Sequence, residues 1–409
     1  MAPAIDAWKR AGVRAALRYA NQEAVSHLTQ ALALLRCLPA SVWRSQEELQ
    51  LLLTLGLPRV QLQGYDSPEV ARTYDRAREL LLELGEAQAP RELSYWGAFA
   101  WLFTQKRFQQ AHEVAALLVR LGRRQQIDEQ LSLGHRMLAT SYFNYGDMPV
   151  ALEHIGKALV ASGDALDLPR QRALSMKHWM NPRAMALAFS SVIRSALDSL
   201  GVARSQAREA VALADRLGHP HTCAGVLTYA AIGAQIRRDA RSVLAWTDRC
   251  IELSGEHRFR LWLWWSMLLK GWALAWLGQA EEGLALMLKA LPGYDGSGFL
   301  TGTPHNQGML AEIHLLLGRT EDGLAAVDRA LAPDNFETGE RAWEADLHLI
   351  RGQLLKQRHQ EAAARKELVQ ALDIARRQGA CLYERRALAR LWRPRDEVGL
   401  VLDRLSAPP

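Results

Sequence analysis

Candidate nucleotide chemistry rests on one Gly-Lys pair, Gly156-Lys157, in a segment of helical periodicity. A phosphate-binding loop needs the pattern G-x-x-x-x-G-K-[ST] on a turn between a strand and a helix. Here Ala151 stands where the first glycine is required, and Ala158 follows the lysine. The glycine-rich stretch 293–302 contains no lysine and follows no predicted strand. The sequence therefore predicts no nucleotide-hydrolysing site.

Candidate metal ligands are equally incomplete. His112-Glu113 begins an H-E-x-x-H zinc motif, but Ala116 occupies the second histidine position. His219-Pro220-His221 offers two imidazoles without a third ligand nearby, which is typical of a turn between helices. No G-x-S-x-G elbow and no reactive-cysteine pattern is present. We expect no catalytic residues, no metal, no cofactor and no enzymatic activity.

Tryptophans give a clearer indication of a binding site than the incomplete nucleotide and metal motifs. In the apolar run 261–278, a stripe formed by Trp262, Trp265, Trp272 and Trp276 follows one face of a helix. One interpretation is a buried helix whose tryptophans fill space left by small neighbours. The alternative is that these rings line a concave groove and bind a ligand, because large amphipathic rings bind at low entropic cost. The four tryptophans are the candidate binding residues.

The same run approaches the length of a membrane span, but Lys270 lies near its middle. Because a central lysine costs about 2.5 to 3.5 kcal/mol in a bilayer, we expect a buried helix and no membrane association. The first twenty residues contain Asp6, Lys9 and Arg10 and no apolar signal core. The four cysteines form no C-x-x-C pair. These features predict a cytoplasmic protein.

The net charge of +6 has a late concentration of arginines. A solvated terminal helix is the simpler interpretation, and a phosphate-binding patch is the alternative. We do not expect nucleic-acid binding. The cluster consists of Arg376, Arg377, Arg385, Arg386, Arg390, Arg393 and Arg395.

Secondary-structure elements must position these residues. A chain of 409 residues is too long for one compact core, so it forms either several domains or a repeat array. One template recurs, with a turn residue T followed by small residues at T+5 and T+12. Five of the eight intervals between successive turn residues are 40 residues long. The turn residues are Tyr19, Asp66, Lys106, Gly146, Asp198, Arg238, Gly278, Gly318 and His359.

Small side chains mark both repeat positions. Eight of the nine residues at T+5 are Ala or Gly, with Val243 as the exception. The nine are Ala24, Ala71, Ala111, Ala151, Ala203, Val243, Gly283, Gly323 and Ala364. Six of the nine residues at T+12 are Ala. The nine are Ala31, Arg78, Leu118, Ala158, Ala210, Cys250, Ala290, Ala330 and Ala371. Both positions lie on one face of the second helix of each pair, about two turns apart. Because two antiparallel helices cross closely only at small side chains, we interpret these as packing residues.

The pattern predicts an all-α fold, a right-handed α-solenoid of about nine antiparallel helix pairs of the tetratricopeptide (TPR) type, with a period of about 40 residues. Two stretches break the period. We predict repeats 1–4 over 1–161, an inserted connection at 162–182, repeats 5–7 over 183–291, a Gly-rich link at 292–304, repeats 8–9 over 305–379, and a terminal helix with a basic tail at 380–409.

The repeats resemble a known family. Six stretches are similar to the long-period TPR region C-terminal to class III adenylate or guanylate cyclase and predicted signal-transduction ATPase domains in bacteria. They are Arg10 to Leu35, Gly64 to Gly85, Glu209 to Pro220, Lys270 to Gly283, Thr338 to Leu354 and Ala371 to Gly379. The architecture is also similar to the sensor region of the maltose-operon transcription activator. Ser175 to Arg183 departs from the family's G-x-D-P-G-like stretch. The chain looks like a detached or truncated regulatory half.

Two functions follow from the repeats and the resemblance. The first is a non-catalytic scaffold or sensor whose concave face binds a protein partner, a peptide segment or a small effector, in the regulatory setting that the resemblance implies. The second is direct small-molecule sensing, of a sugar for example, in a transcription regulator. Neither the partner nor the effector is identified by the sequence.

Overall fold

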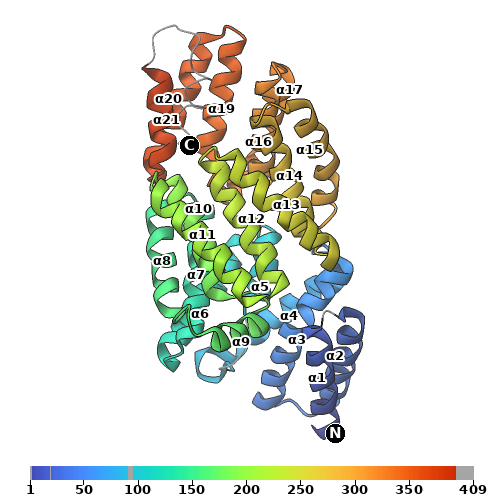
Figure 1. Ribbon diagram of the computed structural model, residues 1–409. Coiled ribbons are helices and arrows are strands. Elements are labelled where there is room, and N and C mark those ends of the chain that lie inside the picture. The colour runs from blue at the N-terminus through green and yellow to red at the C-terminus, as the bar shows by residue number, and fades with distance from the viewer. Residues whose placement is uncertain (1, 19, 91–94, 393–409) are drawn as a thin grey trace.

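The computed structural model describes residues 2–18, 20–90 and 95–392, and within these ranges every regular element is a helix. The predicted all-α solenoid is confirmed: successive helices pack as antiparallel pairs that rise from α1 at one end of the molecule to α20 at the other (Figure 1). The first helices of the pairs are α1 (Ala2–Leu17), α3 (Val42–Gln63), α5 (Trp96–Thr104), α7 (Asp128–Asn144), α10 (Pro182–Ala196), α12 (Pro220–Ile236), α14 (Arg260–Trp276), α16 (Thr303–Leu316) and α19 (Glu344–Gln357).

Each first helix is followed by a partner that packs against it. The second helices are α2 (Asn21–Arg36), α4 (Pro68–Gln88), α6 (Phe108–Gln125), α8 (Met148–Ala161), α11 (Leu200–Leu217), α13 (Ala240–His257), α15 (Ala280–Asp295), α17 (Thr320–Ala330) and α20 (Glu361–Gln378). Three more helices lie outside the described pairs: α9 (Leu168–His178) in the inserted connection, α18 (Pro333–Glu337) between α17 and α19, and α21 (Cys381–Leu391) at the end.

Seven of the nine predicted turn residues adopt the same left-handed backbone conformation. These seven have positive φ, from 56° to 96°: Lys106, Gly146, Asp198, Arg238, Gly278, Gly318 and His359. In all seven turns the residue after T donates its N–H to the carbonyl four residues before T, over 2.8 to 3.0 Å. This is the Schellman ending, which satisfies carbonyls that the last turn of a helix leaves open. Tyr19 lies outside the described residues.

The second repeat is the exception. Its left-handed residue is Gly64, with φ of 88°, and Asp66 does not have positive φ. Ser67 caps the following helix by accepting the Glu69 N–H over 3.2 Å, with Pro68 as the first helical residue, as predicted. The extra turn residues shift the buried face of α4, so Val70 is fully buried while Ala71 is only partly covered.

Close crossings occur where the first helix also has a small residue. Gly271 in α14 lies seven residues before its turn residue, and a methyl group there would come within 2.7 Å of the Gly283 carbonyl of α15. Gly12 and Gly352 occupy the same repeat position, and methyl groups there would crowd Leu28 and Leu368. The other predicted packing residues, apart from Ala71, are buried: Ala24, Ala111, Ala151, Ala203, Gly323, Ala364, Ala158, Ala210, Ala290, Ala330 and Ala371.

First helices lie on the inner side of the solenoid. Helices α10, α12 and α16 are buried on nearly all sides, whereas α11, α13 and α17 bury a single stripe. The apolar run predicted as a buried helix is α14. In the described part of the chain, no helix combines the length and hydropathy needed to span a bilayer.

The C-terminal helix α21 packs against α20, and its end reaches α10 (Figure 1). Arg386 donates to the Ile236 carbonyl over 2.7 Å, and Arg385 pairs with Asp198 at 2.7 Å. Arg376 pairs with Glu384. Much of the late arginine cluster is thus engaged within the fold, and Arg393 and Arg395 lie outside the described residues.

The repeated left-handed turn makes a stability prediction. Gly318→Ala should destabilise the fold by about 1 kcal/mol because an L side chain strains that conformation, and a methyl group there meets no neighbouring atom within 4 Å. His359→Gly, at the same repeat position with φ of 59° and an exposed side chain, should stabilise it by a similar amount. Chemical denaturation followed by circular dichroism measures both changes.

Gly156→Ala is the matched control, because Gly156 lies inside α8, where the backbone is helical and an added methyl group would meet no atom within 4 Å. The same substitution there should stabilise the fold by about 0.5 to 1 kcal/mol. If Gly318→Ala and Gly156→Ala change the stability of the fold in the same direction, the left-handed conformation assigned to Gly318 is wrong.

Candidate functional site

The concave face of the solenoid is closed by contacts between distant repeats. The link after α15 lies against the ends of α3 and α5: the Tyr65 N–H donates to the Ser297 carbonyl over 3.2 Å, and the Leu300 N–H donates to the Thr104 carbonyl over 2.9 Å. Gln105 donates to the Gly298 carbonyl over 2.8 Å, across 193 residues of sequence. Gly298 is required here, because its φ is 73° and a side chain would strike the backbone of Asp66.

A second closure joins the turns after α5 and α7 to the segment around α18. Lys106 donates to Asn335 over 2.6 Å, and the side-chain amide of Asn144 donates to the Gly339 carbonyl over 3.1 Å. In addition, the Arg341 N–H donates a hydrogen bond of 2.7 Å to the Asn144 carbonyl. Hydrogen bonds therefore tie the third and fourth repeats to the eighth and ninth.

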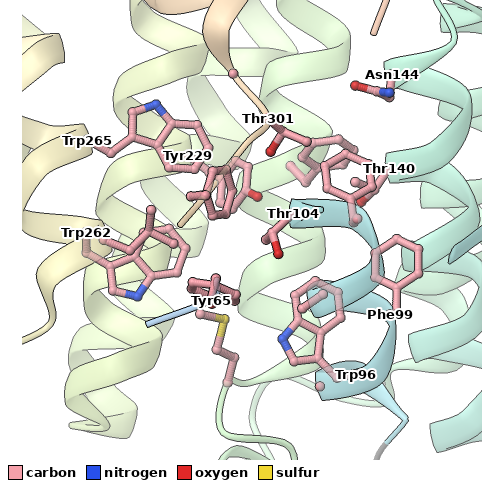
Figure 2. Close-up of a pocket in the computed structure, with 18 of the residues that line it drawn as sticks. Tyr65, Trp96, Phe99, Thr104, Thr140, Asn144, Tyr229, Trp262, Trp265 and Thr301 are labelled. Atoms are coloured by element: carbon pink, nitrogen blue, oxygen red, sulfur yellow. The ribbon is translucent and has the colours of Figure 1, made fainter. Parts of the chain in front are cut away.

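These closures border a partly open cavity of about 150 Å³ at the centre of the molecule. Thirty residues line it, and thirteen of them are aromatic, although aromatic residues make up only 7% of the chain. Figure 2 shows rings converging from α14 on one side and from α5 on the other. The aromatic residues are Tyr65, Tyr74, Trp96, Phe99, Phe103, Phe143, Trp179, Phe189, Tyr229, Trp262, Trp265, Phe299 and Trp343.

Several of these rings are fixed by their neighbours. Trp262 and Trp265 are nearly parallel, with centroids 6.2 Å apart, and Tyr229 meets both edge to face. Trp262 donates its indole N–H to Nε2 of His221 over 3.1 Å, while Nδ1 of His221 donates to the Trp179 carbonyl over 2.9 Å. Both imidazole nitrogens of His221 are thus used. Burial lowers the pKa of His221 to about 4, so this ring is neutral at pH 7.

Glu340 is the one carboxylate of the cavity lining within the described residues, and it lies at the N-terminus of α16. It accepts the Gly302 N–H over 2.5 Å and faces Lys106 at 3.6 Å, while its Oε2 atom has no hydrogen-bond partner. Burial raises the pKa of Glu340 to about 7, and the facing Lys106 ammonium opposes that rise. His305 adds a neutral ring, stacked on Trp343 at 3.9 Å.

The predicted binding tryptophans divide into two pairs. Trp262 and Trp265 line the cavity, whereas Trp272 and Trp276 lie outside its lining. Trp272 is fully buried and donates to Glu312 over 2.7 Å, and Trp276 lies under the Arg238 guanidinium at 4.6 Å. All four share one stripe, but ten residues of helix separate Trp262 from Trp272 by about 15 Å.

Most of the cavity lining was not singled out by the sequence. Trp96 and Phe99 come from the short helix α5, and Tyr229 comes from α12. The two stretches that break the repeat period supply five further residues: Trp179 and Met180 from the inserted connection, and Phe299, Thr301 and Gly302 from the Gly-rich link. The broken period is therefore a sequence signal that could have pointed toward this part of the site.

Other candidate chemistry does not assemble. Among the described residues, no group of three or more His, Cys, Asp or Glu side chains is arranged to hold a metal ion. His219 begins α12 and accepts the Thr222 N–H over 3.2 Å. His112 lies edge to face with Tyr142 at 5.3 Å.

Comparisons with known proteins agree with the fold. No protein-family profile matches the sequence. An uncharacterised protein of Rhizobium meliloti (strain 1021) is 27% identical over 407 residues, a match that covers 98% of this chain and 38% of that protein. The chain therefore spans well under half the length of this relative.

Two solved structures share the architecture. A Rap protein complexed with competence and sporulation factor has a TM-score of 0.62 at 12% identity, covering 92% of this chain and 98% of that one. The apo form of RapI has a TM-score of 0.50 at 10% identity, covering 91% and 98%. At these identities the similarity shows a shared TPR-like fold.

The raised pKa of Glu340 predicts a pH dependence. The carboxyl has its ordinary pKa of 4.5 in the unfolded chain and about 7 in the fold, so protonation favours the folded state. Its stabilising contribution is complete below pH 4.5 and is lost as the pH rises through 7. Glu340→Gln, which is neutral at every pH, should therefore be more stable than the wild type at pH 8 and equally stable at pH 4.5 in thermal unfolding.

Glu337→Gln is the control, because it removes an exposed carboxylate three residues away on α18. The difference in stability between Glu337→Gln and the wild type should not grow between pH 4.5 and pH 8. A constant difference between Glu340→Gln and the wild type from pH 4.5 to 8 would contradict the burial of a neutral carboxyl.

Proposed function

We propose that this chain is a non-catalytic sensor module that binds a small, largely apolar effector in the central aromatic cavity. The observation that carries the proposal is the enclosure of thirteen aromatic residues by hydrogen-bonded contacts between repeats far apart in sequence. Ligand sites are typically concave and mainly apolar, with a few fixed polar groups that set orientation. Here Thr104, Thr140, Asn144 and Glu340 are such groups.

The closed concave face favours a small effector over an extended protein segment. An extended segment needs an open groove with edges along which its backbone can bond, and here loops occupy that space. A sugar is also less favoured, because it would need many hydrogen-bond partners and most of the lining offers ring faces. A protein partner would then contact the outer surface of the solenoid.

Occupancy of the cavity would change the contacts that close it. Tyr65, Phe299 and Thr301 belong both to the lining and to the segments that join the two halves, so a bound effector would stabilise the closed arrangement. A ligand shifts such an equilibrium by its difference in affinity for the two states. We infer that this difference is the signal that an attached or associated protein detects.

The setting of the module is inferred from its relatives. The R. meliloti relative is much longer than the matched region, and the sequence resembles TPR regions that follow cyclase and ATPase domains. We propose that the chain regulates such a catalytic partner, in the cytoplasm. All four cysteines are free, and Cys37 and Cys381 are exposed, which suits a reducing compartment.

The proposal is tested with one-ring probes. Isothermal titration of the 409-residue chain with toluene, indole, phenylacetamide and phenylacetate should show saturable binding of at least one of them, with a rise in unfolding temperature. Ala100→Phe, which fills the cavity from α5, should abolish that binding. Ala362→Phe, on the exposed face of α20, should leave it unchanged. If no probe binds, or if Ala100→Phe binds as well as the wild type, the cavity is not an effector site.

A further inference from the structure

Arg136 is a buried cation without a counter-charge beside the cavity. It belongs to α7 and is 3% exposed, with its guanidinium carbon 3.6 Å from the centroid of the Trp96 ring. None of the carboxylates in the described residues pairs with it, and its Nε atom has no hydrogen-bond acceptor. Burial lowers the pKa of Arg136 to about 10, so it remains charged at pH 7. A buried, unpaired charge is a costly feature for a fold to keep.

Helix α7 places Arg136 in line with the cavity wall. Arg136, Thr140 and Asn144 follow each other at intervals of four residues and therefore form one row on the helix. Thr140 and Asn144 line the cavity, and so does Trp96, the ring that the guanidinium covers. Figure 2 shows these three residues on the same side of the cavity. Arg136 itself is not part of the lining: it lies one helical turn from Thr140 and against the Trp96 ring, next to the cavity wall.

The charges around the cavity sum to a positive excess. Glu340 faces Lys106 at 3.6 Å and, because its pKa is raised to about 7, it balances that ammonium only in part at pH 7. Glu129, the acid at the start of α7, is committed to Lys177 at 2.7 Å and to His178 at 2.5 Å. Arg136 remains, with one positive charge. A ligand with a single negative charge would neutralise it, whereas a cationic ligand would meet both Arg136 and Lys106.

The cavity volume limits the rest of the ligand. A cavity of about 150 Å³, the size found here, holds one benzene ring in an engineered protein. The surrounding ring faces favour a flat, apolar group, and the polar row leads from it toward Arg136.

We propose that the effector is a small monocarboxylate with a single aromatic or similarly compact apolar group, and that Arg136 binds its carboxylate. This inference rests on the proposed sensor function and specifies its ligand. Guanidinium groups bind carboxylates through charge-assisted, often paired hydrogen bonds, and in a site shielded from water such bonds are strong. The aromatic group occupies the space between Tyr229, Trp262 and Phe99.

The test compares phenylacetate with phenylacetamide, which has the same shape and no charge. Isothermal titration of the 409-residue chain at pH 7 should show that the carboxylate binds about tenfold more tightly or better. Arg136→Met should remove this preference while the amide binds as before. Arg136→Lys, which keeps the charge, should retain part of it.

Arg237→Met is the matched control. Arg237 is another buried arginine, bonded to the Ser195 hydroxyl at 2.7 Å, and it differs from Arg136 in that its guanidinium does not cover Trp96 of the cavity lining. This variant should keep the full preference for the carboxylate. A thermal melt of each variant without ligand shows whether it is folded.

The outcomes separate the two proposals. Equal or tighter binding of the amide by the wild type overturns the carboxylate inference, even if Arg136→Met does not fold, and leaves the sensor function standing. A preference that survives in Arg136→Met, or is lost in Arg237→Met, also overturns it. If neither phenylacetate nor phenylacetamide binds while toluene or indole does, the cavity accepts neutral rings and the inference fails. Absence of binding by all four probes removes the sensor function as well.

Discussion

Close approach of paired helices at small residues is the constraint on which the structure depends. Where Gly271 of α14 meets Gly283 of α15, there is no room for even one additional methyl group. In seven pairs a left-handed turn before the second helix fixes the register of that contact, with the same pair of hydrogen-bonding positions each time. Because each pair repeats this geometry, small rotations between pairs add up to a superhelix. The inner face is consequently curved enough for distant repeats to meet.

The superhelix is closed by the places where the repeat fails. The Gly-rich link reaches the ends of α3 and α5, and the segment around α18 reaches the ends of α5 and α7. The second repeat, whose turn is irregular, is the one whose Tyr65 bonds to that link. Irregular segments have backbone groups free to bond elsewhere, whereas helices have used theirs. Regular repeats therefore build the frame, and irregular connections close the site.

The buried arginines Arg238 and Arg136 differ in how their charge is compensated. Arg238, a turn residue in the left-handed conformation, pairs with Glu312 and lies 3.8 Å from Asp346, which Arg386 approaches at 3.9 Å. These contacts join α16, α19 and α21, so the strain of a non-glycine turn residue is offset by what its side chain binds. Arg136 has no carboxylate partner in the described residues, and its guanidinium contacts the Trp96 ring instead. Folds tolerate this kind of local cost mainly at functional sites.

The sequence by itself determined the helical class, the number of pairs, seven of the nine turn residues and most of the small packing positions, because these depend on local periodicity and on side-chain size. It also indicated Trp262 and Trp265. Only the tertiary structure decided which aromatic residues share a cavity, because Trp96, Tyr229 and Trp343 come from repeats far apart in sequence. It likewise separated Trp272 and Trp276 from the other pair and revealed Glu340 and Arg136 as buried charges. The direction in which a superhelix closes depends on the sum of many small rotations between helix pairs, and no single repeat encodes that sum.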